Sequence, residues 1–234
     1  STQGYSSAAS DVYKRQYVYL PSVIKNNYKN IIKKYLEDII QKYKIKGFVI
    51  SNLSNLKFLE GYKSNFEIIG NSSLNIFNNY SIKECAEYGI NKVTLSRELS
   101  KTELEDILKY NLDIDTELIV YGTLPIMSCN YCFLGKSNMC YPECKRLCSD
   151  DNSYYLKDRL GFKFRIVSDN IQSITSIFNS KILSISPKTF NVSSVRIDIL
   201  DENVTTVNKI IETVKSGKSF EGKEYTSGRL EEEK

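Results

Sequence analysis

The feature that most constrains the fold of this 234-residue chain is a repeated alternation of strand-like and helix-like segments. Short apolar runs are followed by stretches such as 28–43, where apolar side chains recur at helical spacing and charged ones fill the other face. Strands joined through helices pair in parallel beneath a helical layer. The expected strands are residues 17–20, 47–50, 67–70, 92–95, 117–121, 162–167, 182–185 and 195–199, and the expected helices are 28–43, 81–88, 100–108 and 204–214. Two helices are expected to open with capping boxes, Ser81 with Glu84 and Ser100 with Glu103.

This alternation predicts an α/β fold of the TIM-type (β/α) barrel class. Strands 162–167 and 182–185 are assigned to a small β excursion, which leaves about six major strands. These are fewer than the eight of a complete barrel, so we expect an incomplete barrel whose first βα units are missing. An open doubly wound sheet is the alternative, but no glycine-rich phosphate loop follows any expected strand. Residues 154–167 alternate in polarity around Gly161 and predict a small β excursion, with which 182–185 is expected to pair.

Composition divides the chain into three parts. Residues 1–16 lack apolar periodicity and resemble a translated sequencing adapter, so we expect a foreign or disordered tail. Residues 17–217 form the expected barrel portion, which includes a cysteine-rich segment at 129–148. Residues 218–234 form a polar tail.

Five of the six cysteines fall between residues 129 and 148, and the chain contains no histidine. Thiolates are soft ligands, so a cluster this dense indicates a metal or an iron–sulfur centre held by sulfur alone. The lack of histidine excludes Ser-His-Asp and Cys-His catalysis and an imidazole general base. The sixth cysteine, Cys85, lies on an expected helix and is interpreted as a small buried apolar side chain.

The spacing of the clustered cysteines leaves two kinds of site open. Cys140, Cys144 and Cys148 are four residues apart, and together with Cys132 they provide four thiolates suited to a cubane cluster. Cys129-x-x-Cys132 with Cys144-x-x-x-Cys148 instead satisfies the spacing of a tetrahedral zinc site. Spacing alone favours zinc.

Several segments carry a family resemblance in a fixed order along the chain: 71–75, 93–99, 117–127 followed by the cysteines, 155–161, 177–180 and 222–228. Together they are similar to peptidase family U32, the collagenase-like peptidases of unassigned catalytic type. The similarity extends from residue 17 to residue 228. It implies a βα barrel of which the first two strands are absent here.

The resemblance also implies a cofactor and a reaction. Several branches of that family carry a Cys-ligated 4Fe–4S cluster and hydroxylate an RNA base or a quinone precursor, and others are described as peptidases. On this basis a 4Fe–4S cluster is preferred over zinc. Its expected ligands are Cys132, Cys140, Cys144 and Cys148, with Cys129 as the alternative.

One position departs from the family pattern. Many members have a Cys-Arg pair shortly after the aspartate that corresponds to Asp169, whereas this chain has Gln172 and Ser173 there. If that cysteine is a ligand in other members, this chain completes its site differently.

Candidate catalytic groups lie near strand ends. Glu98 and Asp198 stand at or just beyond the carboxyl ends of expected strands, where barrels carry their chemistry. Arg196 neighbours Asp198, and Asp158 follows the cysteines. A helix cap or a surface ion pair explains each of them equally well. Three asparagines either bind a polar ligand at the same carboxyl ends of the strands or shape turns: Asn52, Asn71 and Asn75.

The sequence therefore predicts an enzyme that acts on an RNA base or a small aromatic precursor by hydroxylation, or on a peptide. The alternative is a non-catalytic interaction module with a structural zinc site made of four cysteines.

The net charge of +4 is not gathered into a basic block, which is typical of a solvated surface and does not forbid RNA. No apolar run approaches the ~20 residues of a membrane helix, so no membrane partner is expected, whereas a partner subunit stays open. The lack of a secretion signal favours a cytoplasmic location.

Overall fold

The computed structural model describes residues 16–110, 114–136, 148, 153–169 and 172–231. The chain divides into two compact units: unit 1 comprises residues 1–118, 190–195 and 229–234, and unit 2 comprises 119–189 and 196–228. Two strands, β5 (Asp115–Gly122) and β11 (Ser194–Asp198), contribute to both units. Apart from Gln16, the tail expected at 1–16 lies outside the described residues.

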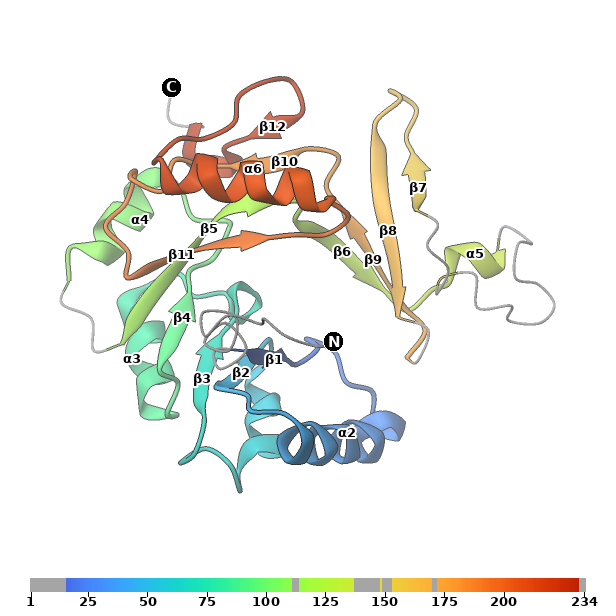
Figure 1. The fold of residues 1–234 in the computed structure, drawn as a ribbon, viewed down its shortest axis with the longest axis vertical. Helices are drawn as coiled ribbons and strands as arrows, with labels where there is room; N and C mark the ends of the chain where they lie inside the picture. Colours follow the sequence, from blue (N-terminus) through green and yellow to red (C-terminus); the bar gives the residue numbers. More distant parts are fainter. Residues whose placement is uncertain (1–15, 111–113, 137–147, 149–152, 170–171, 232–234) are drawn as a thin grey trace, which may run out of the picture. The chain divides into compact units, whose positions relative to one another are not determined.

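Unit 1 contains a parallel sheet in the strand order β1-β2-β3-β4-β5 (Figure 1). Short apolar strands with helical connections pair in this way, as the alternation predicted. The strands before β5 are β1 (Tyr17–Tyr19), β2 (Gly47–Ile50), β3 (Glu67–Gly70) and β4 (Lys92–Thr94). The α-helices of this unit are α2 (Lys29–Lys42), α3 (Asn79–Glu87) and α4 (Lys101–Leu108).

The two faces of the unit 1 sheet differ in chemistry. Phe48, Ile50, Ile68 and Val93 alternate onto one face and are buried. Helices α2, α3 and α4 supply the covering layer through their buried side chains Leu36, Ile82, Cys85, Leu104 and Ile107. The opposite face is mixed: it carries Val49 and Ile69 beside polar and ionisable side chains such as Thr94 and Glu117.

Side-chain caps set the starts of the helices. The predicted capping box of α4 is confirmed: the Glu103 N–H donates to Ser100 Oγ at 3.3 Å, and the Ser100 N–H donates to Glu103 Oε2 at 2.7 Å. The predicted cap of α3 is wrong, because Asn78 takes that place and its Oδ1 accepts the Ser81 N–H at 2.9 Å. Asparagine caps a helix as well as serine does, so the helix begins earlier than Ser81.

Unit 2 combines the end of β5 with a separate antiparallel sheet. β10 (Ile182–Ser184) pairs antiparallel with β5, and β12 (Tyr225–Thr226) pairs in parallel with β10. The expected pairing of 182–185 with the β excursion is therefore wrong. The second sheet has the order β6-β9-β8-β7, with β6 (Pro125–Cys129), β7 (Tyr154–Lys157), β8 (Lys163–Asp169) and β9 (Ile174–Phe178). The closing helix is α6 (Val204–Lys215), as predicted.

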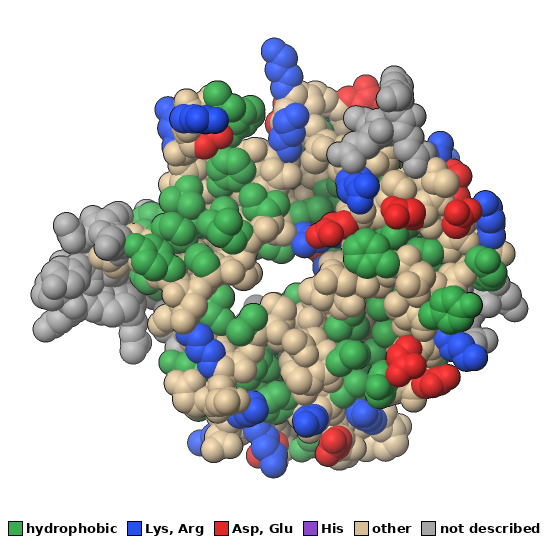
Figure 2. Space-filling model, turned by 180° about the vertical axis from the view of Figure 1, so that it is seen from behind, with side chains coloured by type: hydrophobic (Ala, Val, Ile, Leu, Met, Phe, Trp, Pro, Cys, Tyr) green, Lys and Arg blue, Asp and Glu red, His purple; other side chains and the backbone are tan. Residues whose placement is uncertain are grey.

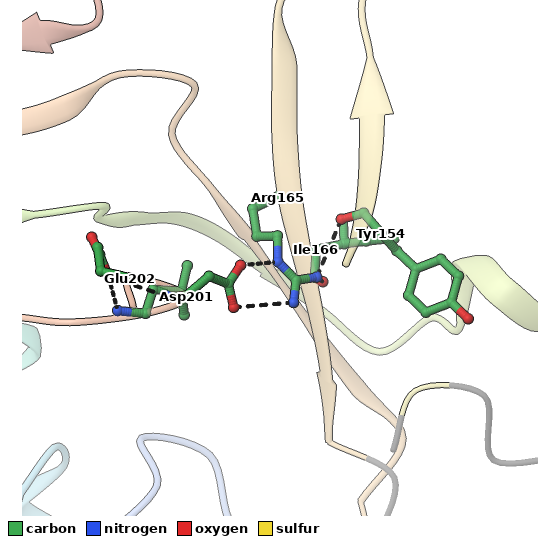
Figure 3. Close-up of polar contacts among 6 residues, drawn as sticks. Tyr154, Arg165, Ile166, Asp201 and Glu202 are labelled. Carbon is green, nitrogen blue, oxygen red and sulfur yellow. Dashed lines mark hydrogen bonds and ion pairs between the residues drawn. The ribbon is translucent and has the colours of Figure 1, made fainter. Parts of the chain in front are cut away.

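Arg165 ties this second sheet to the segment before α6 (Figure 3). Its guanidinium forms a bidentate pair with the Asp201 carboxylate, and its Nη1 donates to the carbonyl oxygens of Ile166 at 2.6 Å and Tyr154 at 3.3 Å. The guanidinium also lies 5.7 Å from the centre of the Tyr155 ring. With 14% of its side chain exposed, Arg165 is a structural anchor within unit 2.

No strand pairing among the described residues closes either sheet into a barrel. The parallel sheet with its helices confirms the α/β class, whereas the TIM-type barrel stays a prediction. Within the same residues, no helix is both long and apolar enough to cross a membrane.

An ion-pair cluster at the start of β3 should make stability depend on acid pH. Hydrogen bonds from Lys46, at 2.8 Å, and from the Tyr17 hydroxyl lower the pKa of Glu67 below its ordinary value of 4.5. A carboxylate whose pKa is lowered by folding stabilises the folded state at pH values above its ordinary pKa. This stabilisation is lost as the pH falls through the folded-state pKa. Glu67→Gln should therefore flatten the acid limb of stability measured by urea unfolding between about pH 5 and 3. An unchanged acid limb would contradict this role.

Candidate functional site

The cysteine-rich segment begins at the end of β6 in unit 2. Cys129 is the last residue of β6 and lies opposite Thr175 of β9. Cys132 directly precedes the short helix α5 (Phe133–Lys136). Between the two cysteines, the carbonyl oxygen of Tyr131 accepts the Thr175 hydroxyl at 2.7 Å. The antiparallel sheet therefore holds the backbone from which both cysteines project.

The sulfur atoms of these two cysteines differ in their hydrogen bonds. Cys129 Sγ lies 3.6 Å from the carbonyl oxygen of Thr175, to which its S–H can donate. Cys132 Sγ accepts the backbone N–H of Gly135 at 3.3 Å, and Cys132 is exposed. Backbone N–H groups stabilise thiolates, the form that binds metals. The two sulfur atoms therefore differ in exposure and in hydrogen-bond partner.

The remaining cysteines are placed only in part. Cys148 is half-buried, and Cys140 and Cys144 lie outside the described residues. Among the residues that the structure does describe, no group of three or more Cys, Asp or Glu side chains could hold a metal ion. The four-ligand set thus stays a prediction. Cys85 of α3 is buried as expected, and burial raises the pKa of its thiol.

Gln172, the residue that stands in place of the family's cysteine, closes the β8–β9 turn. Its side chain is 2% exposed, and its Nε2 donates to Asp169 Oδ2 at 3.1 Å. Its backbone N–H donates to Asp169 Oδ1 at 3.0 Å, and Ser173 follows with a left-handed φ of 56°. The departure from the family pattern therefore has a structural role in this chain.

Asp198 and Arg196 are brought together at the end of β11. Arg196 Nε donates to Asp198 Oδ1 at 2.6 Å, and its Nη2 donates to Oδ2 at 2.9 Å. The backbone of Asp198 lies against Gly122 of β5. A carboxylate engaged through both oxygens by one guanidinium serves as a fixed anchor better than as a general base.

Glu98 lies in the turn after β4 in unit 1. Its carbonyl oxygen accepts Arg229 Nη1 at 2.8 Å, and its N–H donates to Ser96 Oγ at 3.3 Å. Within the described part of the chain, the Glu98 carboxylate itself makes no hydrogen bond or ion pair. Its backbone shapes the turn, and its side chain is exposed.

Asp158 shapes the turn between β7 and β8. Its Oδ1 accepts the backbone N–H groups of Leu160 and Phe162, each at 2.9 Å. The backbone of Gly161, with a φ of 89°, completes the turn by donating to the Asp158 carbonyl oxygen at 3.2 Å. This use of the carboxylate is that of a turn residue.

Substitution of Asp158 tests whether its carboxylate stabilises the turn. Asp158→Ala is expected to lower the free energy of unfolding by about 1 kcal/mol, because two N–H groups lose their acceptor. Asp158→Asn keeps an acceptor oxygen and should stay within about 0.5 kcal/mol of the parent chain in urea unfolding. Equal losses in the two variants would contradict the turn role.

A row of polar side chains crosses the carboxyl ends of the unit 1 strands. Thr94 of β4 lies opposite Glu117 of β5, and its hydroxyl donates to Glu117 Oε1 at 2.9 Å. Asn71 and Ser51 stand one residue beyond β3 and β2, and the strand register places them on the same face as Thr94. Asn71 Nδ2 donates to Ser51 Oγ at 3.3 Å. We call these four residues the polar row.

The three asparagines that the sequence singled out have different roles. Asn71 belongs to the polar row and also donates to the Tyr19 hydroxyl at 2.7 Å. Asn52 caps the 3-10 helix η2 (Leu53–Leu59) through the Ser54 N–H. Asn75 ends η3 (Ser72–Leu74) with a left-handed φ of 53°. Asn71 is therefore the asparagine that fits a ligand site, and the other two shape turns.

Ser51, Thr94 and Glu117 were missed by sequence reasoning, although a signal was present. A parallel strand buried on both faces is apolar almost throughout. Here polar residues recur at matching positions: at or just after the ends of β2, β3 and β4, and within β5 opposite the end of β4. Ligands of open α/β sheets bind at the carboxyl ends of the strands, so this recurrence indicates a binding face.

Tyr121, near the end of β5 in unit 2, is held in its neutral form. Burial raises the pKa of Tyr121 to about 12, and the charge of Glu202 adds to this effect. Phe220 packs edge-on to Tyr121 at 5.6 Å and stacks on Tyr225 at 5.4 Å. At neutral pH the Tyr121 phenol can donate a hydrogen bond but cannot act as a base.

Comparison with known proteins gives one match. The family model described as Peptidase family U32 matches residues 3–213, a range that begins inside the segment expected to be a foreign tail. No curated protein and no solved structure matches the chain.

Proposed function

This chain belongs to peptidase family U32, and from that premise we propose that it works as an enzyme with a Cys-ligated 4Fe–4S cluster in unit 2. Cys132, Cys140, Cys144 and Cys148 would hold the cluster, and Cys129 would be a bystander. A 4Fe–4S cluster bound there would supply one-electron transfer. The proposal includes a cytoplasmic location, where thiolates stay reduced.

The contrast between Cys129 and Cys132 carries this proposal. Cys132 is exposed, and its sulfur accepts an N–H from Gly135, the kind of hydrogen bond that cluster sulfurs accept. Cys129 instead uses its S–H as a donor to a strand carbonyl. This contrast in exposure and in hydrogen-bond partner supports Cys132 as a ligand and Cys129 as a bystander within the proposal.

We place the substrate at the polar row of unit 1. At the carboxyl ends of the strands, Asn71 and Thr94 are buried at 5% and 0% exposure and support the site from below, and Glu117 brings a half-buried carboxylate. Tyr19, which is 54% exposed beside Asn71, offers an aromatic ring. A flat ligand with a hydrogen-bonding edge suits such a site. The proposed substrate is an RNA base or a small aromatic precursor, and the proposed reaction is hydroxylation, in which a C–H bond becomes C–OH and an oxygen-donating co-substrate would supply the oxygen atom and accept the two electrons.

Peptide hydrolysis is the other activity that the family name suggests. Because the chain has no histidine, hydrolysis would require a metal, a pair of carboxylates or a partner subunit. Robust cleavage of a peptide by the purified chain, abolished by replacing one Ser or Asp, would favour hydrolysis over hydroxylation.

Metal analysis of anaerobically purified protein tests the proposal directly. About four irons and four acid-labile sulfides per chain would support the cluster. About one zinc per chain, without sulfide, would overturn it in favour of an interaction module with a structural four-cysteine site.

A further inference from the structure

The β7–β8 hairpin ends in a turn that is rigidly built. The Asp158 carboxylate holds the Leu160 and Phe162 N–H groups, and the Asp158 N–H donates to the Phe162 carbonyl oxygen at 3.1 Å. Gly161 supplies the left-handed φ that closes the turn. Leu160 and Phe162 are therefore presented in a fixed position.

Both of these apolar side chains are exposed at the end of the hairpin. Leu160 is 75% exposed and Phe162 is 46% exposed. At this end of the sheet, Figure 2 shows hydrophobic and basic side chains together with acidic atoms between them. Exposed apolar side chains on a preorganised turn favour contact with an apolar environment.

Three cations flank the two apolar side chains in the sequence, Lys157, Arg159 and Lys163, and the anionic Asp158 lies in the same turn. Lys157 and Lys163 lie directly opposite each other across β7 and β8, an arrangement that destabilises a hairpin. Among the described residues none of the three forms a salt bridge, whereas Arg165 of the same hairpin is already held by Asp201. The three cations exceed the one carboxylate of the turn, Asp158, and the opposed Lys157 and Lys163 repel each other, so an anionic partner would offset this repulsion.

We propose that this hairpin end docks on an anionic lipid surface. Leu160 and Phe162 would enter the boundary between head groups and acyl chains, and Lys157, Arg159 and Lys163 would contact the anionic head groups. Leu160, the more exposed of the two apolar side chains, favours lipid over single-stranded RNA because leucine has no π-face on which a base can stack, whereas Phe162 has one, so RNA binding is included as an outcome of the test. The inference goes beyond the proposed function, because it describes peripheral contact with a membrane and does not depend on the cluster or the substrate.

Co-sedimentation of the full chain with vesicles tests this docking. We expect binding to phosphatidylcholine vesicles that contain about one-third phosphatidylserine, and much weaker binding to phosphatidylcholine alone. Leu160→Ser with Phe162→Ser should lower the lipid affinity on the order of tenfold. Lys157→Gln with Lys163→Gln should lower it roughly 25-fold, because each cation near such a surface contributes about fivefold.

The controls keep the outcome interpretable. Replacing the opposed Lys157 and Lys163 removes a repulsion, so this variant should be at least as stable as the parent chain in urea unfolding. Val204→Ser, at an equally exposed apolar position of α6, should bind lipid like the parent chain. All variants should keep the parent iron and sulfide content, which separates this test from that of the proposed function. Absence of binding to anionic vesicles, binding that survives both double substitutions, or hairpin-dependent binding of single-stranded RNA without lipid binding would each overturn the proposal.

Discussion

Anaerobically purified Cys132→Ala protein is expected to lack the visible sulfur-to-iron absorbance of the parent chain, and its iron content should fall severalfold. A cubane cluster needs its four thiolates, so the loss of one ligand leaves three unpaired thiolates and an unstable centre. The structure sharpens this expectation, because Cys132 Sγ already accepts the Gly135 N–H while exposed to solvent. Iron and sulfide assays beside the absorbance spectrum provide the measurement.

Cys129→Ala is the matched control, since it removes a thiol from the same short segment. Among the described residues, the hydrogen bond of the Cys129 sulfur is a 3.6 Å contact with a strand carbonyl. Loss of this thiol should therefore leave the spectrum and the iron content unchanged. Cys140→Ala should behave like Cys132→Ala. If Cys129→Ala bleaches the protein while Cys140→Ala does not, the ligand assignment is wrong, and the pair Cys129 and Cys132 replaces it.

Gly122→Ala is expected to lower the free energy of unfolding by about 3 kcal/mol or more. Gly122 has a φ of 146°, which a residue with a side chain adopts only under strain. An added Cβ would also lie 2.6 Å from the Asp198 carbonyl oxygen and 2.7 Å from Asp198 Cβ. Backbone cannot move aside as a flexible side chain can, so the end of β5 and the ion pair between Asp198 and Arg196 should be displaced together.

Two other glycines calibrate this measurement in the same urea-unfolding series. Gly89→Ala meets nothing within 4 Å but keeps a φ of 80°, so it should cost about 1 kcal/mol from backbone strain alone. Gly61→Ala has open space, and its φ lies outside the left-handed region, so its effect should be within about 0.5 kcal/mol. A Gly122→Ala effect no larger than that of Gly89→Ala would show that Asp198 does not pack against this backbone.

Much of the secondary structure was predictable because its signals are local. The strands Gly47–Ile50 and Glu67–Gly70 are short apolar runs bounded by polar residues, and both appear with the predicted bounds. The capping box of α4 joins residues three apart in sequence, so its side chains and backbone suffice to specify the start of that helix. The start of α3 was misplaced because two residues within three positions can both act as caps.

The small antiparallel sheet was predicted only in part. β6 and β9 lie 46 residues apart at the pair formed by Cys129 and Thr175, and neither strand has a clear apolar alternation of its own. Their pairing depends on long-range backbone hydrogen bonds, which local sequence does not encode. The partner of β10 was wrong for the same reason, because β5 and β12 compete with the β excursion for one apolar strand.

The sequence by itself determined the α/β class, the density of thiol ligands and the absence of imidazole chemistry, since composition and local periodicity carry these properties. It also carried enough ordered similarity to indicate peptidase family U32, which the family model confirms. Only the tertiary structure decided that Thr94 and Glu117 share the polar row with Asn71, and that Asp158 and Gln172 serve turns. It also distinguished the Cys132 sulfur as an acceptor from the Cys129 sulfur as a donor. The physical reason is that strand register and hydrogen-bond direction depend on partners far along the chain, whereas residue type and helical or strand periodicity do not.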